Sequence, residues 1–264
     1  KHDDIWLCHA ARIAIESQPV ETWIEKALRE TDATAALTAL MALTRTADAK
    51  HQSQILRRLA EFPLDELSPD QRLIALRTYQ LCFIRLGPPK QETMRSVLEK
   101  IEPHFPSDDP RADGLSCGLL CYLRSEASIE KTVALLEGDR SETEKLYYLF
   151  TLRHVKEGWT PAQRKTFFLW LRKARGFEGA HYVPRFVHYI EQDSLAQLTQ
   201  KQRDEVLPIL NAKVDSPAID LSAGRDFVKD WKLIDFVFSL GKVGQGRDFE
   251  QGERMFAAAR CSAC

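Results

Sequence analysis

The residues with the clearest chemical potential stand at the end of the sequence. Cys261-Ser262-Ala263-Cys264 is a Cys-x-x-Cys pair, and the sequence ends on its second cysteine. Followed by histidine, such a pair would be the c-type haem attachment motif, in which both thiols bind the macrocycle and the histidine ligates its iron. The given sequence does not contain that histidine. A zinc half-site, a redox dithiol and coincidence are the alternatives.

The residues before this pair predict a short helix. Asp248 can cap its N-terminus, and Gly252 and Phe256 lie four residues apart, on one face. A glycine there would let another helix approach closely, and Phe256 would pack near the macrocycle. The segment resembles the opening helix of a small c-type cytochrome domain, although its spacing from Phe256 to Cys261 is one residue longer than in ordinary soluble cytochromes c. The resemblance implies that Cys261 and Cys264 are haem-binding residues.

The other four cysteines fall inside helical patterns among apolar neighbours. They are Cys8, Cys82, Cys117 and Cys121. Cysteine in such a setting behaves as a small hydrophobic residue, so we expect them in the core. Cys117 and Cys121 share one helix face, with a backbone geometry poorly suited to a disulfide. A metal or redox role for this pair is the alternative.

A basic run without any acidic residue lies between Gly158 and Phe177, and aromatic residues are interleaved with it. It could bind another protein module, a lipid or a nucleic acid. A solvated helix face above a buried aromatic face explains the pattern equally well. The residues are Arg164, Lys165, Phe167, Phe168, Trp170, Arg172, Lys173 and Arg175.

Other candidate sites are weaker. His181, His188 and Glu191 would lie on one side of a helix and could hold zinc, but they lack the i, i+4 spacing of persuasive sites. We expect ordinary surface or hydrogen-bonded histidines. Asp108-Asp109, in a proline-rich loop, is expected to serve as a turn and helix cap. The sequence shows no glycine-rich phosphate loop and no nucleophile elbow, so we expect no catalytic residue and no metal site.

Composition limits the function classes. The 264 residues suffice for one large domain or two small ones, and 44% hydrophobic with 28% charged residues is ordinary for a globular protein. The formal net charge of −1 argues against nucleic-acid binding, which usually needs a basic excess. No apolar run approaches the roughly 20 residues that cross a bilayer. No signal peptide is present, and because the sequence reads as an excised fragment, this says nothing of the parent protein's location.

Almost every segment has helical periodicity, and no convincing strand pattern occurs. Ser68 and Thr160 are each followed by proline and then by glutamine at the capping-box position. In the first helix, Trp6, Ala10 and Ala14 are expected on the apolar side. The expected helices cover about 3–17, 20–28, a stretch from 32, 50–62, 69–86, 91–101, 115–123, 129–136, 141–155, 161–174, 181–195, 199–210 and 227–240.

These helices form pairs that begin near residues 4, 33, 69, 113, 142 and 181. Such spacings predict an all-α fold, a HEAT- or armadillo-like α-solenoid of stacked helix pairs, with an irregular helical bundle as the alternative. From residue 212 the sequence becomes linker-like. We therefore expect a helical repeat domain over 1–211, and over 212–264 a linker, an amphipathic docking helix and the truncated start of a cytochrome c-type domain.

Four segments together carry a wider resemblance, which covers most of the chain. They are Trp6–Glu16, Tyr79–Leu86, Gly158–Trp170 and Asp248–Cys264. The chain resembles the large secreted proteins of planctomycetes and verrucomicrobia that join a sugar-dehydrogenase-like β-propeller, a HEAT-like helical region and a C-terminal haem-binding Cys-x-x-Cys-His domain. This resemblance implies an extracytoplasmic, for example periplasmic, electron-transfer setting and a neighbouring dehydrogenase module.

The resulting expectation is a non-catalytic helical scaffold that links a dehydrogenase-type domain to a covalently attached haem c domain. Haem c would belong to the parent protein rather than to this fragment. The expected partners are the neighbouring domains of the same parent chain and a further protein, without nucleic acid and without a membrane span. One alternative is a scaffold that binds a peptide or polysaccharide and has no redox role. Another is an enzyme such as a HEAT-like DNA glycosylase.

Overall fold

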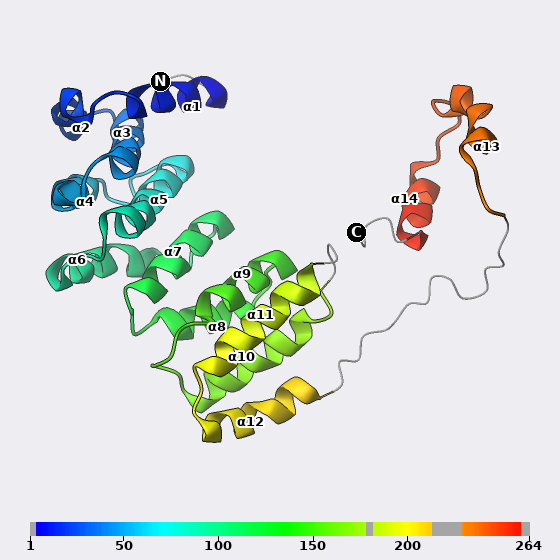
Figure 1. The fold of residues 1–264 in the computed structure, drawn as a ribbon. Coiled ribbons are helices and arrows are strands. Elements are labelled where there is room, and N and C mark those ends of the chain that lie inside the picture. The colour runs from blue at the N-terminus through cyan, green and yellow to red at the C-terminus, as the bar shows by residue number, and fades with distance from the viewer. Residues whose placement is uncertain (1–3, 178–181, 213–228, 260–264) are drawn as a thin grey trace.

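The computed structural model describes residues 4–177, 182–212 and 229–259, and within them the fold is all-α (Figure 1). The expected fold class is confirmed in this respect. The α-helices are α1 Ile5–Glu16, α2 Ile24–Arg29, α3 Ala33–Thr46, α4 Gln52–Ala60, α5 Pro69–Leu86, α6 Gln91–Ile101, α7 Pro110–Tyr122, α8 Ser128–Glu137, α9 Glu142–Leu152, α10 Pro161–Ala174, α11 Val183–Ala196, α12 Gln200–Asn211, α13 Leu233–Val237 and α14 Phe249–Ala258. Short 3₁₀ turns cover Val20–Thr22, Ala49–His51, Glu102–His104 and Leu240–Lys242.

Helix starts are set by side-chain caps. The capping boxes expected at Ser68 and Thr160 are present, and Ser141 and Thr199 form two more. Asp109 caps α7 by accepting a hydrogen bond from the Arg111 N–H, followed by proline at the first position. This cap confirms the role expected of Asp109. It also makes α7 start at residue 110, earlier than the expected 115, because the proline begins the helix instead of belonging to the loop.

Helices α1 to α12 form two layers, and this part is called the helix stack below. The odd layer holds α1, α3, α5, α7, α9 and α11, each packed against the next. In the even layer, α2 contacts α4, and α10 contacts both α8 and α12. Figure 1 shows the pairs following one another from α1 to α12. The all-α class is as the sequence predicts, while a solenoid of HEAT- or armadillo-like repeats stays a prediction.

The core lies between the two layers. Its fully buried leucines come from almost every pair, and burial of this kind contributes about 2 kcal/mol for each side chain. They include Leu37, Leu40, Leu43, Leu76, Leu120, Leu136, Leu149 and Leu171. Each helix pair buries its apolar face against the neighbouring pairs. The shared core therefore holds the exposed side chains of successive helices at fixed relative positions.

The first helix departs from expectation. Trp6, Ala10 and Ala14 are exposed, as is Cys8, which was expected in the core. Helix α1 packs against α3 on one side only, where the Glu16 carboxylate pairs with Arg45 at 2.9 Å. The outer side of α1 has no neighbouring helix among the described residues, so its apolar side chains stay in solvent.

The tail also departs from expectation. Instead of a helix over 227–240, the structure shows a five-residue helix, α13, and a 3₁₀ turn, while residues 227–228 lie outside the described part. Aromatic and β-branched residues have low helix propensity, and a helix this short needs packing partners to persist. Helix α14 forms as expected. No helix in the described ranges is long and apolar enough to cross a membrane.

Candidate functional site

Helix α14 is the described element that precedes the Cys-x-x-Cys pair in the sequence. The Asp248 carboxylate accepts a hydrogen bond from the Gln251 N–H at 2.9 Å and so caps the helix, as the sequence predicts. Gly252 and Phe256 follow on one face. Cys261 and Cys264 themselves lie outside the described residues, so the structure places the helix that would present them but not the two thiols.

The surface of α14 bears on whether a haem fits here. A hollow lies over Gly252, bounded by Phe249 and Phe256, with Arg247 and Glu253 at its rim. No atom lies within 4 Å of the place where a Cβ on Gly252 would stand. Both rings are largely exposed. An apolar group or a crossing helix would fill this hollow, so the described residues leave space for a neighbour beside Gly252.

The expected metal candidates do not come together. His181 lies outside the described residues, and His188 is exposed. Glu191 is buried and engaged by Arg175, whose Nη2 donates to the Glu191 Oε2 at 3.0 Å. Among the residues that the structure describes, no group of three His, Cys, Asp or Glu side chains could hold a metal ion. The structure therefore offers no support for zinc at this helix.

The basic run of α10 is divided between two roles. Arg172 and Arg175 donate to the carbonyls of Ile209 and Leu210 at the end of α12, where a cation is favoured by the helix dipole. Lys173 lies over the Trp170 ring with its Nζ 4.1 Å from the centroid. The interleaved Phe167 and Phe168 are buried. The run thus serves mostly to join α10 to α12 over a buried aromatic face, which is the simpler of the two explanations.

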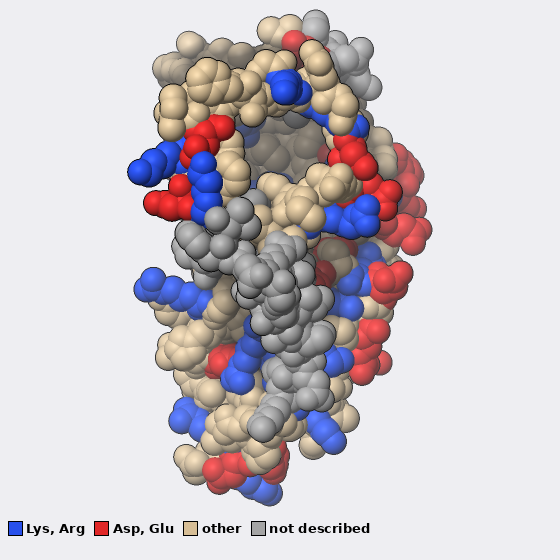
Figure 2. All heavy atoms as spheres, turned by 90° about the vertical axis from the view of Figure 1, so that its right-hand side faces the viewer, with Lys and Arg blue, Asp and Glu red and all other residues tan. Residues whose placement is uncertain are grey.

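The charge distribution of the surface agrees with this. Figure 2 shows basic and acidic side chains lying close together on the face it displays, without a continuous field of either sign over the described residues. Nucleic-acid binding depends on a basic field that follows the phosphate backbone. The visible face does not provide one.

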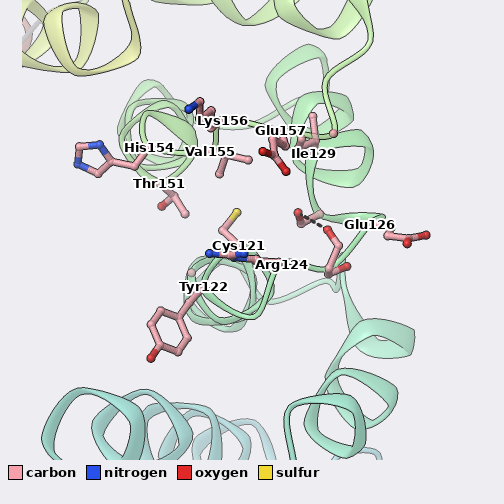
Figure 3. A pocket seen from close by; sticks show the side chains of 14 residues that line it. Cys121, Tyr122, Arg124, Glu126, Ile129, Thr151, His154, Val155, Lys156 and Glu157 are labelled. Carbon is pink, nitrogen blue, oxygen red and sulfur yellow. Dashed lines mark hydrogen bonds between the residues drawn. The ribbon is translucent and has the colours of Figure 1, made fainter. Parts of the chain in front are cut away.

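Sequence reasoning missed a cavity of about 620 Å³ between the ends of α7, α8 and α9. Its lining comes from two separate stretches, 118–129 and 151–158: Gly118, Cys121, Tyr122, Arg124, Ser125, Glu126, Ser128, Ile129, Thr151, His154, Val155, Lys156, Glu157 and Gly158. In Figure 3 the Cys121 sulfur points into the cavity, toward Thr151 and Val155, whereas His154 and Glu126 point away from its centre. The volume falls in the range of small-ligand sites.

Two charged residues of this cavity are notable. Arg124 occupies the left-handed region, with φ +57°, in the position that glycine usually takes after a helix. Within the described residues, the Arg124 guanidinium and the Glu157 carboxylate have no hydrogen-bond or ion-pair partner, although both residues line the same cavity. A ligand that carries an acidic and a basic group, such as a peptide segment, would complement them.

Neighbouring side chains lower the pKa of the Cys121 thiol. Thr132 Oγ1 lies 3.4 Å from the Cys117 Sγ, and both residues are buried. A hydrogen bond from the Cys117 thiol holds the pKa of Cys121 below its ordinary value, although burial acts in the opposite direction. The hydrogen bond to Cys121 raises the pKa of Cys117, and burial raises it further. Cys121 is therefore the member of the pair that ionises first, and it faces the cavity.

Three helices of the odd layer each carry a partly exposed tyrosine, and one of these tyrosines lines the cavity. Tyr122, Tyr147 and Tyr189 come from α7, α9 and α11 and are about half exposed. Tyr147 lies against the glycine face of α7, since a Cβ on Gly114 would stand 3.3 Å from its ring. Tyrosine offers a large contact area with little loss of side-chain entropy, which suits peptide or sugar contacts.

The hollow over Gly252 on α14 and the cavity between the ends of α7, α8 and α9 are the two candidate sites that the described residues offer. No protein-family model matches the chain, and neither a curated protein nor a solved structure matches it. The functional assignment therefore depends on the geometry described above and on the resemblance carried by the tail.

Proposed function

We propose that this chain is a non-catalytic helical scaffold in a multidomain electron-transfer protein, joining a dehydrogenase-type domain to a haem c domain. The observation that carries the proposal is α14. It is capped at Asp248 and leaves an apolar hollow over Gly252, and in the sequence Cys261 and Cys264 follow shortly after its last residue, Ala258. In this role the two thiols bind the haem covalently, and the haem supplies one-electron transfer when bound.

The helix stack would act as the spacer. Stacked helix pairs with a shared core resist bending more than a linker does, so they can hold two modules at a set distance. The exposed outer side of α1, with Trp6 77% and Leu7 51% exposed, offers an apolar surface for the module that precedes it. Residues 213–228 then connect the stack to the haem-bearing segment.

The resemblance of the chain implies an extracytoplasmic setting, and the proposal therefore includes a location in the periplasm or an equivalent compartment. Covalent haem attachment at Cys-x-x-Cys-His agrees with such a setting. The partners in the proposal are the neighbouring dehydrogenase and cytochrome domains of the same parent protein.

The test is expression of the reading frame through the residues encoded after Cys264, together with a cytochrome maturation system. We expect a histidine directly after Cys264 and a haem absorption band that survives denaturation, because thioether bonds are not broken by unfolding. The control is the Cys261→Ser/Cys264→Ser variant, which should fold but stay colourless. A different residue after Cys264, or a colourless wild-type protein, would remove the haem proposal.

A second candidate is a scaffold that binds a peptide or polysaccharide, favoured by the odd-layer tyrosines and the adjoining cavity. Selection from a random peptide library and a glycan array would test it. Ligands recovered with the wild type should lose at least about tenfold in affinity with Tyr122→Ser/Tyr147→Ser, since buried aromatic contacts dominate such interfaces. The matched control is Tyr182→Ser/Leu207→Ser. It changes two other exposed apolar side chains, one directly before α11 and one in α12. No enrichment on either library would exclude this function.

A further inference from the structure

The cavity between the ends of α7, α8 and α9 has a thiol, a cation and an anion in its lining. The Cys121 sulfur points into it, toward Thr151 and Val155 (Figure 3). The volume of about 620 Å³ lies in the range of sites that hold small ligands. A small molecule that enters the cavity therefore meets the sulfur.

The turn that ends α7 fixes Arg124 relative to Cys121. The Arg124 N–H donates to the Cys121 carbonyl at 3.2 Å, and the Ser125 N–H donates to the Leu120 carbonyl at 2.9 Å. These two hydrogen bonds form a Schellman motif, whose left-handed residue is usually glycine. The Ser125 hydroxyl also donates to the Glu102 carboxylate at 2.7 Å. The backbone at Arg124 is thus held in place, so its side chain leaves the helix end at a defined position.

Arg124 and Glu157 supply the two charges of the cavity. In the view of Figure 3 their side chains lie on opposite sides of the Cys121 sulfur, whereas Lys156 points away from it. Neither the Arg124 guanidinium nor the Glu157 carboxylate is paired with another group among the described residues. A ligand with a carboxylate and an ammonium group would give each of them a charge-assisted hydrogen bond.

Cys121 is the reactive member of its pair. Cys117, one helical turn earlier, is fully buried, and its sulfur lies 3.4 Å from Thr132 Oγ1. The hydrogen bond from Cys117 lowers the pKa of Cys121, which favours the thiolate, the form that attacks disulfides. Two cysteines at this spacing on one helix are poorly placed to bond to each other. A disulfide between Cys121 and an external thiol is therefore not displaced by Cys117.

We propose that Cys121 is a modification site, which forms a mixed disulfide with a small amino-acid or peptide thiol bound in this cavity. The Cys121 thiolate attacks one sulfur of the disulfide form of that small thiol. The sulfur–sulfur bond of the reagent breaks, and one half becomes bonded to Cys121. The other half leaves as a thiolate and takes up the proton that Cys121 released. Cys121 is oxidised and the leaving half is reduced, so the exchange needs no further oxidant.

In the bound ligand, the carboxylate pairs with Arg124 and the ammonium group pairs with Glu157. This arrangement distinguishes an amino-acid or peptide thiol from a thiol with a single kind of charge. The inference goes beyond the proposed scaffold function and does not depend on haem.

The first test uses the full chain in a Cys8→Ser/Cys261→Ser/Cys264→Ser background. The probe is glutathione disulfide, whose halves each carry carboxylates and an ammonium group, and peptide mass mapping locates the adduct. We expect an adduct at Cys121 and none at Cys82, since burial raises the pKa of Cys82 to about 12. No adduct at Cys121, or an intramolecular disulfide in its place, would overturn the inference.

The second test asks whether the two charges recognise the ligand. It compares glutathione disulfide with cystamine, which carries only ammonium groups, and with dithiodiglycolate, which carries only carboxylates. Each rate is divided by the rate for the same protein unfolded in urea, which removes differences in intrinsic reactivity. Arg124→Gln should slow glutathione disulfide and dithiodiglycolate about fivefold, the upper range for a partly exposed ion pair, and leave cystamine unchanged. Glu157→Gln should slow glutathione disulfide and cystamine and leave dithiodiglycolate unchanged.

Arg95→Gln, at an exposed position of α6, is the matched control and should leave all three rates unchanged. If Arg124→Gln or Glu157→Gln changed the three rates by one common factor, these residues would only support the local structure, and the inference would be wrong. The result is separate from that for the proposed function. Cys261 and Cys264 are replaced in the protein used here, whereas covalent haem attachment is measured on the parent protein that retains them.

Discussion

The Asp113 carboxylate is completely buried in α7 and is paired with Arg140 at 2.9 Å. The same carboxylate accepts hydrogen bonds from the backbone N–H of Ser107, at 2.6 Å, and from its hydroxyl, at 2.9 Å. Burial raises the pKa of Asp113, whereas these donors and Arg140 act in the opposite direction. The pair thus joins the loop before α7 to the turn before α9.

Arg140→Met should destabilise the helix stack by about 3 kcal/mol, because it leaves a buried carboxylate without its cation. Urea unfolding followed by circular dichroism measures this. The double variant Asp113→Asn/Arg140→Met should recover part of the loss, since it removes the unpaired charge. Arg111→Met, which breaks an exposed pair with Asp109, is the control and should cost less than about 1 kcal/mol. Equal losses for Arg140→Met and Arg111→Met would contradict the assignment.

The helix stack was predictable from sequence where local signals agree with tertiary packing. Ser68 and Thr160 are N-cap residues with proline and glutamine at fixed offsets, and both helices begin where the sequence indicates. The pair starts are also close to expectation, because each apolar stripe has a neighbouring stripe to cover. Periodicity predicts a helix well when the face it defines is buried.

The same reasoning failed where the apolar face has no partner. Trp6 was expected on the apolar side of the first helix, and residues 227–240 were expected to form a docking helix. Trp6 and Phe238 are both exposed, because periodicity does not show whether a neighbouring element is present. The cavity at Cys121 was missed for another reason. Its walls come from two stretches, 118–129 and 151–158, that meet only in the folded chain, and a left-handed Arg124 has no signature in the sequence.

Arg124→Gly should stabilise the protein by about 1 kcal/mol, because glycine adopts the left-handed conformation without steric strain. Thermal and urea unfolding would measure the gain. Arg124→Ala is the matched control: it also removes the guanidinium but keeps a Cβ at φ +57°, so it should not gain stability. A glycine variant no more stable than the alanine variant would show that the backbone is not strained at this residue.

Glu144→Gln should cost about 0.5 kcal/mol at pH 7, because an anion in the first turn of a helix is stabilised by the backbone dipoles. The Ser141 hydroxyl and N–H hold the pKa of Glu144 below its ordinary value. A lowered pKa in the folded state stabilises the protein above the unfolded value, near 4.3. The contribution is lost as pH falls through the folded pKa, so the difference between wild type and variant should vanish in acid.

The boxes at Ser68, Thr160 and Thr199 provide the control for this substitution, because each carries glutamine at the same position. Gln163→Glu in α10, whose first turn has no acidic residue, should gain about as much at pH 7 as Glu144→Gln loses. A difference between wild type and Glu144→Gln that persists unchanged at low pH would exclude the ionised carboxylate as its source.

Cys121 should be alkylated by iodoacetamide in the folded protein at a pH below the ordinary thiol range near 8.5. The hydrogen bond from Cys117 lowers its pKa, and the cavity gives the reagent access. Burial raises the pKa of Cys82 to about 12, so this thiol should stay unmodified under the same conditions. Peptide mass mapping over a series of pH values measures both rates, in a Cys8→Ser background because Cys8 is exposed.

Cys117→Ala separates the hydrogen bond from simple access to the cavity. Without a donor at residue 117, the pKa of Cys121 should rise and the alkylation profile should move to higher pH. Cys117→Ser keeps a hydroxyl donor next to Thr132 and should leave the profile closer to that of the wild type. If the alanine variant shows the same profile as the wild type, the Cys117 thiol does not tune Cys121, and the reactivity of this residue is set by its exposure alone.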